Sequence, residues 1–267
     1  MKKIFLPAGT LMLALFTGSC YKNPVTGRSS VNIVDEGTLS SLSNQQYTTF
    51  LSENKVIKGT PEAATVKKVG DRLAAAINRY FASKNQSSVL KGYKWEFNLV
   101  NSKEINAWCM PGGKVVVYSG ILPVTRSEAG LAVVMGHEIA HAVARHGNER
   151  MSQGLLQQAG GVALSVALAN KPAQTQQLFS TAYGVGTNVG LMLPFSRKHE
   201  SEADEMGLIF MAMAGYDPNE AVGFWQRMAA AGGSKPPELL STHPSDATRI
   251  ADLKKLVPKA MQYYKAG

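Results

Sequence analysis

The pentapeptide His137-Glu138-Ile139-Ala140-His141 constrains this chain more than any other stretch of its sequence. It follows the apolar run Ala129–Met135, which is typical of a buried helix. Histidines four positions apart on a helix lie on one face, so both imidazoles can bind one Zn²⁺. Glu138 could then take a proton from a zinc-bound water. The pattern predicts zinc-assisted hydrolysis, most often of peptides; the alternative is a helix with two ordinary surface histidines.

The limits of this helix can be predicted from flanking residues. Thr125-Arg126-Ser127-Glu128 reads as a capping box, with Thr125 as the N-cap and Glu128 at the third helical position. We therefore expect a helix over about residues 125–147. A third histidine ligand on its extension would stand at position 147, which is Gly147. His146 is interpreted as a cap of the helix C-terminus.

A third zinc ligand is expected downstream, in the segment 196–205. Glu200 and Asp204 are four positions apart and share a helical face. Glu200 could bind the metal while Asp204 accepts the ring N–H of a ligating histidine. His199 and Glu202 are rival ligands, and a solvated acidic helix face is the alternative.

Several further motifs occur in one order along the chain: Asn106-Ala107-Trp108, Pro111-Gly112-Gly113, Arg145-His146, Ser196-Arg197, Glu200-Ser201-Glu202-Ala203-Asp204, Thr242-His243-Pro244 and Arg249-Ile250. With the pentapeptide they resemble the HtpX and CAAX-prenyl-protease type of zinc metalloendopeptidases, in their soluble bacterial lipoprotein branch. The resemblance implies one Zn²⁺ bound by His137, His141 and Glu200, catalysis by Glu138, and Asp204 as ligand support. It also implies that misfolded or mis-assembled envelope proteins are the substrates.

Two residues near the C-terminus are further site candidates. His243 lies in a loop that is expected to reach the active site. There it could bind the oxyanion or occupy the fourth zinc position in a resting state, or it could only order the loop. Arg249 is expected to pair with an acidic site residue or with the substrate.

The predicted fold class is α+β: a mainly helical, zincin-like domain with a small sheet whose edge strand flanks the zinc helix. The expected helices span 35–55, 61–83, 125–147 and 196–214, with others opening at Asp217-Pro218 and Ser245, and the expected strands span 93–100 and 114–118. Lys114, Val115, Val116, Val117 and Tyr118 are expected to form the edge strand, which could bind an extended peptide. The alternative is an ordinary interior strand.

The N-terminal residues resemble a bacterial lipoprotein signal. Lys2 and Lys3 precede the apolar run Ile4–Phe16, and small residues lead to Cys20. We expect a signal peptide over 1–19, a lipidated Cys20 with a loop-like tether over 20–34, and a metallopeptidase domain over 35–267. Ordinary cleavage nearby or an uncleaved anchor are the alternatives. Tyr21 favours the periplasmic face of the outer membrane over the inner membrane.

The net charge of the chain and its distribution limit which classes of partner are expected. The formal net charge is +9, or +7 without Lys2 and Lys3 (9 − 2), but no basic run exceeds two residues and no nucleic-acid motif occurs. Nucleic-acid binding is therefore not expected. If Cys20 is acylated, Cys109 cannot form an intrachain disulfide and is expected to be buried and structural.

The segment 151–196 has Lys171 as its one charged residue, but its uncharged apolar runs are too short to span a membrane. It is expected to form a helical hairpin beside the zinc helix, or a lid or contact surface.

The sequence therefore predicts a lipid-anchored zinc endopeptidase of the bacterial envelope, with unfolded proteins as substrates and the outer-membrane assembly machinery as a possible partner. A membrane-tethered chaperone or assembly factor with gated proteolysis is the main alternative. A zinc-stabilised structural lipoprotein is a third possibility.

Overall fold

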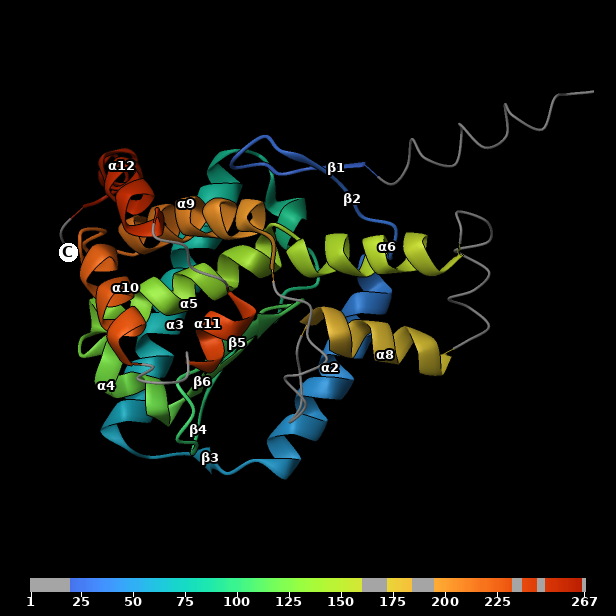
Figure 1. Cartoon of the computed structure of the whole chain (residues 1–267). Helices are drawn as coiled ribbons and strands as arrows, with labels where there is room; N and C mark the ends of the chain where they lie inside the picture. The colour runs from blue at the N-terminus through green and yellow to red at the C-terminus, as the bar shows by residue number, and fades with distance from the viewer. Residues whose placement is uncertain (1–19, 160–171, 184–194, 232–236, 244–247, 266–267) are drawn as a thin grey trace, which may run out of the picture.

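The computed structural model describes residues 20–159, 172–183, 195–231, 237–243 and 248–265. These residues form an α+β fold in which helices surround a small sheet, as predicted from the sequence (Figure 1). The helices are α2 (Glu36–Glu53), α3 (Pro61–Ser83), α4 (Leu122–Thr125), α5 (Glu128–Val143), α6 (His146–Ala159), α8 (Pro172–Tyr183), α9 (Arg197–Met213), α10 (Glu220–Ala231), α11 (Glu238–Thr242) and α12 (Arg249–Met261). The strands are β1 (Cys20–Lys22), β2 (Ser29–Val31), β3 (Val56–Ile57), β4 (Glu96–Val100), β5 (Ala107–Met110) and β6 (Lys114–Tyr118).

The larger sheet has the strand order β3-β4-β6-β5. β6 pairs in parallel with β4 and antiparallel with β5, so Lys114–Tyr118 is an interior strand. The prediction that Lys114–Tyr118 forms the edge is therefore wrong. The edge strand beside the α5 helix is β5, whose four residues, Ala107–Met110, we did not predict as a strand.

Alternate residues of β6 face two different cores. Val115 and Val117 pack with α3, α5 and α9 in the main core. Val116 and Tyr118 pack with aromatic residues of α2 and with α6 and α8 in a second core. Because both faces of β6 are covered, its uninterrupted apolar sequence needs no polar side.

The α5 helix begins later than predicted. Ser127 is its N-cap and accepts a hydrogen bond from the Gly130 N–H at 3.0 Å. Thr125 instead ends α4, and its hydroxyl donates to the carbonyl of Leu122. Arg126 between them has a φ of 62°, which separates the two helices. The predicted cap at Thr125 is therefore wrong.

α5 and α9 cross in close contact, and glycines permit it. A Cβ atom added to Gly207 would lie 2.9 Å from the backbone nitrogen of His137, and one added to Gly136 would lie 3.0 Å from the Gly207 carbonyl oxygen. Side chains at these two positions would force the helices apart. The crossing therefore sets the distance between the histidines of α5 and the acidic residues of α9.

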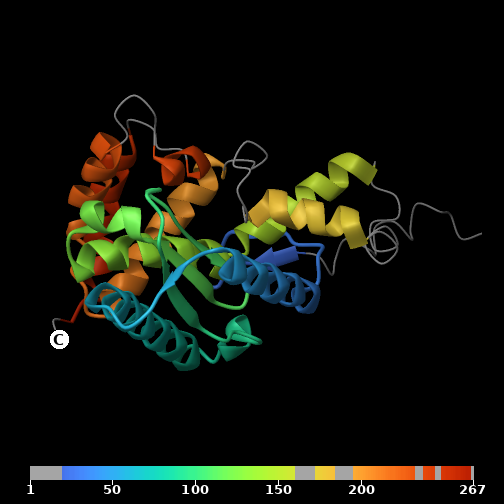
Figure 2. The same cartoon turned by 90° about the horizontal axis from the view of Figure 1, so that it is seen from below.

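α6 and α8 lie side by side and extend from the body of the molecule (Figure 2). This agrees with the helical hairpin predicted for 151–196; residues 160–171, between the two helices, lie outside the described residues. No helix within the described ranges combines the length and the hydropathy that a membrane span requires.

The start of the described chain also differs from prediction. Residues 20–31, expected as a loop-like tether, form a hairpin of β1 and β2. The hairpin runs over α9 and α6 (Figure 1).

Candidate metal centre

Four buried side chains from three parts of the fold meet at one point. His137 and His141 come from α5, Glu200 comes from the first turn of α9, and His243 directly follows α11. One ligand atom from each lies within 4.8 Å of the others. These four residues are called the ligand cluster below. The structure thus brings together all three predicted zinc ligands and the predicted loop histidine.

The spacings within the ligand cluster suit a tetrahedral metal. His137 Nε2 lies 3.1 Å from His141 Nε2 and 3.3 Å from His243 Nδ1. Carboxylate oxygens of Glu200 lie 3.3 Å from the Nε2 atoms of both His137 and His141, and 2.9 Å from His243 Nδ1. Around Zn²⁺ with bonds near 2.0–2.1 Å, tetrahedral ligand atoms are about 3.3 Å apart. Glu200 Oε2 is buried and makes no hydrogen bond among the described residues, so it is available to bind a metal ion. The nitrogen and oxygen atoms of the ligand cluster therefore fit Zn²⁺.

Asp204 and Arg249 support His137 from behind. Asp204 Oδ1 lies 2.9 Å from His137 Nδ1, so it can accept the ring proton and leave Nε2 for the metal. Arg249 donates to both Asp204 oxygens, at 2.9 and 2.6 Å, and its guanidinium stacks 3.4 Å from the centre of the Trp225 ring. Burial alone would raise the pKa of Asp204, but the charges and hydrogen bonds of Arg249 and His137 together outweigh burial and lower that pKa.

Glu138 is a buried carboxylate beside the ligand cluster rather than part of it. Its Oε1 atom lies 3.5 Å from His243 Nε2 and makes no hydrogen bond among the described residues. Burial raises the pKa of Glu138 to about 7. A carboxyl group with a pKa in this range can exchange protons near neutral pH.

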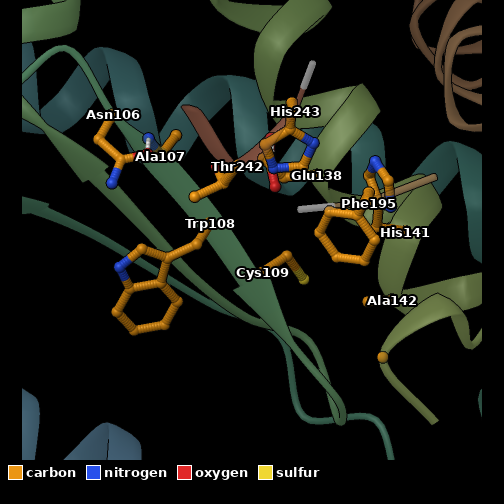
Figure 3. A pocket seen from close by; sticks show the side chains of 11 residues that line it. Asn106, Ala107, Trp108, Cys109, Glu138, His141, Ala142, Phe195, Thr242 and His243 are labelled. Carbon is orange, nitrogen blue, oxygen red and sulfur yellow. Dashed lines mark hydrogen bonds and ion pairs between the residues drawn. The ribbon is translucent and has the colours of Figure 1, made fainter. Parts of the chain in front are cut away.

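A pocket joins Glu138 and the ligand cluster to strand β5 (Figure 3). Its lining residues are Asn106, Ala107, Trp108, Cys109, Glu138, His141, Ala142, Gly147, Phe195, Thr242 and His243. The Phe195 ring packs at a tilt against His141, with ring centres 4.1 Å apart, and against His243, with ring centres 4.9 Å apart. Cys109 is half-buried at the pocket wall rather than enclosed in the core, and burial raises the pKa of its thiol.

The rival ligands point elsewhere. His199 pairs with Glu149 at 3.1 Å. Glu202 pairs with His146 Nε2 at 2.9 Å. His146 itself is the first residue of α6 and its Nδ1 lies 2.9 Å from His141 Nδ1, so its interpretation as a cap of the zinc helix is wrong.

Lys114 and Cys20, both predicted as functional residues, lie outside the lining of the pocket. Within the predicted substrate strand, the Lys114 amine is buried and pairs with Glu96, away from the pocket. Cys20 is exposed at the start of β1 and has a free thiol. Phe195 and Trp225 were not predicted, because neither belongs to a motif and only the fold brings their rings against the histidines of the site.

Comparison with known proteins gives a consistent result. The model of peptidase family M48 matches residues 62–257. The mitochondrial metalloendopeptidase OMA1 of Schizosaccharomyces pombe is 42% identical over 175 residues, which cover 65% of this chain and 50% of that protein. OMA1 of Saccharomyces cerevisiae is 30% identical over 269 residues, or 94% of this chain and 75% of that protein. The β-barrel assembly-enhancing protease of Escherichia coli is 35% identical over 166 residues, or 59% of this chain and 33% of that protein. The chain therefore spans about half the length of the fission yeast relative, and less of the bacterial one.

Proposed function

Since this chain belongs to peptidase family M48, we propose that it acts as a zinc metalloendopeptidase that cleaves extended segments of unfolded or mis-assembled proteins. The observation that carries the proposal is a single pocket. In it a buried carboxylate, Glu138, lies beside the ligand cluster and beside the edge strand β5.

Glu138 is the proposed general base. When bound, Zn²⁺ polarises the scissile carbonyl and lowers the pKa of water at the site to about 7. Glu138 takes a proton from the attacking water and passes it to the leaving amine. Asp204 keeps the Nδ1 proton of His137, so that Nε2 presents its lone pair to the ligand cluster. Arg249 holds Asp204 ionised and in place.

Strand β5 is the proposed substrate-binding edge. The N–H of Tyr118 donates to the carbonyl of Asn106 at 3.1 Å. From this pair onward, hydrogen-bonded and non-hydrogen-bonded pairs of residues alternate along the antiparallel strands β5 and β6. By this alternation the backbone groups of Ala107 and Cys109 point away from β6. A substrate segment could add there as a further strand, with its scissile bond near Glu138.

His243 is the proposed gate of the site. With His137, His141 and Glu200 it gives the ligand cluster four members, whereas a working zinc site keeps one position open. The N–H of Phe195 donates to the Thr242 carbonyl at 3.0 Å, so the segment carrying His243 is held closed over the pocket. This closed arrangement supports a protease whose activity is regulated. It also fits the alternative function, an assembly factor of the same fold that cleaves little.

Substitution of the gate is expected to increase activity. We expect His243→Ala to keep zinc on the other three ligands and to raise the rate of casein cleavage. If the open state is about 10% populated in the wild type, removal of the gate raises the rate up to ~10-fold. Initial rates at equal zinc content measure this, with Ser241→Ala as the control in the same segment. A large fall in rate at unchanged zinc content would instead indicate that His243 binds the oxyanion.

We also propose where the protein acts. The segment that ends at Cys20 resembles a lipoprotein signal, and Cys20 is exposed, which supports lipid anchoring on the periplasmic face of the outer membrane. The similarity to the β-barrel assembly-enhancing protease of E. coli supports mis-assembled envelope proteins as substrates and the assembly machinery as partner.

Cleavage of an unfolded protein tests the proposed function. The zinc-loaded chain is expected to cleave casein, to stop when a chelator removes the metal, and to recover when zinc is returned. A chaperone of the same fold would keep casein soluble without new fragments. If both the wild type and His243→Ala bind one zinc and release no fragments, the protease proposal is wrong.

A further inference from the structure

Residues 20–31 pack onto the helices that carry the metal centre. β1 and β2 pair antiparallel, and the turn between them buries Asn23 almost completely. The Asn23 amide donates to Glu202 Oε1 of α9 at 2.8 Å, across 179 positions of sequence. The hairpin is thus a fixed part of the domain surface (Figure 1).

The Glu202 carboxylate forms hydrogen bonds with residues of the hairpin and of α6. Besides Asn23, the hydroxyl of Thr26 and the Nε of Arg28 donate to it, and His146 Nε2 lies 2.9 Å from Glu202 Oε2. Arg28 also binds Glu149 with two nitrogens, at 3.0 and 2.7 Å. These contacts hold the Glu202 carboxylate in one orientation.

His146 connects Glu202 to the ligand cluster. Its Nδ1 lies 2.9 Å from His141 Nδ1, so one of the two facing nitrogens must carry a proton and the other must not. His141 directs Nε2 into the ligand cluster, so its proton lies on Nδ1 and is donated to His146. His146 then carries its own proton on Nε2, which Glu202 accepts. Each ring has one tautomer that satisfies every contact.

The hairpin also holds the C-terminal end of α5. The hydroxyl of Tyr21 donates at 3.1 Å to the carbonyl of Val143, two residues after His141. Arg145 stacks 4.3 Å over the Tyr21 ring. Terminal carbonyls of a helix lack partners within the helix, so this bond fixes the turn that carries His141.

We propose that the hairpin Cys20–Val31 is a positioning element of the metal centre, in which Arg28, Asn23 and Thr26 hold Glu202 so that His146 fixes the tautomer and orientation of His141. The arrangement parallels the other metal histidine, where Arg249 holds Asp204 behind His137. The inference rests on the proposed function only in taking zinc as the bound metal.

Zinc affinity tests this inference in the full chain. Arg28→Met is compared with Lys22→Met, which removes a positive charge from an exposed position of the same hairpin. Loss of a partner behind a metal ligand typically weakens binding about 10- to 100-fold. We expect Arg28→Met to raise the zinc dissociation constant by about 10-fold, and Lys22→Met to leave it unchanged. Competition with a chromophoric chelator measures the constant.

A second variant keeps the test decisive if Arg28→Met fails to fold. Glu202→Gln keeps the shape of the side chain and removes its charge, and it too is expected to weaken zinc binding. If folded Arg28→Met or Glu202→Gln melts at a lower temperature without metal but binds zinc as tightly as the wild type, the hairpin has only a structural role and the inference is overturned. Because zinc binding is measured without substrate, a chain that cleaves nothing can still confirm this inference while it disproves the proposed protease activity.

Discussion

Glu138→Gln is expected to leave the zinc content of the protein unchanged and to remove its cleavage of casein. Glu138 lies beside the ligand cluster but is not one of its members, so an amide at this position does not change the metal donors. An amide cannot accept the proton of the attacking water. General-base catalysis typically contributes about 10²- to 10⁴-fold, and we expect a loss of kcat in this range.

A matched substitution on the same helix separates this effect from a change in stability. Glu128 begins α5, more than two turns before Glu138, and pairs at the surface with Lys68 at 2.7 Å. Glu128→Gln removes the same charge and is expected to cost at most about 1 kcal/mol of stability, with no loss of activity. Equal cleavage by Glu138→Gln and the wild type, measured at one zinc per chain, would disprove the proposed mechanism.

The local parts of the metal centre were predictable from the sequence. Spacing of four places His137 and His141 on one helical face, and the same spacing relates Glu200 to Asp204. Helix periodicity alone could not bring the two helices together. Gly136 and Gly207, which allow the crossing of α5 and α9, were the available signal in the sequence.

The edge strand was mispredicted for an identifiable physical reason. Val115–Val117 is a continuous run of β-branched residues, which is typical of a strand covered on both faces rather than of an exposed edge. The true edge, β5, has four residues and lies next to β6. A strand this short gives too few positions for alternation to be recognised.

Contacts made by His146 and by the hairpin could not be predicted from local patterns. His146 stands next to Gly147, and this neighbourhood suggested a helix cap. Its actual partners are His141, five residues earlier, and Glu202, 56 residues later. Only the packing of α6 against α9 and of the hairpin against both determines which of these contacts forms.

Glu200→Ala is expected to lose zinc under conditions in which the wild type holds one ion per chain. Glu200 is the single carboxylate of the ligand cluster and contacts all three histidines, at 2.9 to 3.3 Å. Its removal should weaken zinc binding by more than the roughly 10- to 100-fold typical for a partner behind a ligand. Measurement of metal content after dialysis against a weak chelator tests this, with Glu205→Ala on the same helix as the control.

The Glu200→Ala substitution should also remove most of the stabilisation that zinc binding gives to the folded state. A ligand present at about 1,000 times its dissociation constant stabilises the folded state by about 4 kcal/mol, which corresponds to a rise in Tm of roughly 8–16 °C for a chain of this size. Wild type and Glu205→Ala should show this rise when zinc is added, because Glu205 pairs with Lys259 outside the pocket. Glu200→Ala should show little of it. If Glu200→Ala instead binds and is stabilised by zinc like the wild type, His243 suffices as the third ligand, and the proposed role of His243 as a gate is wrong.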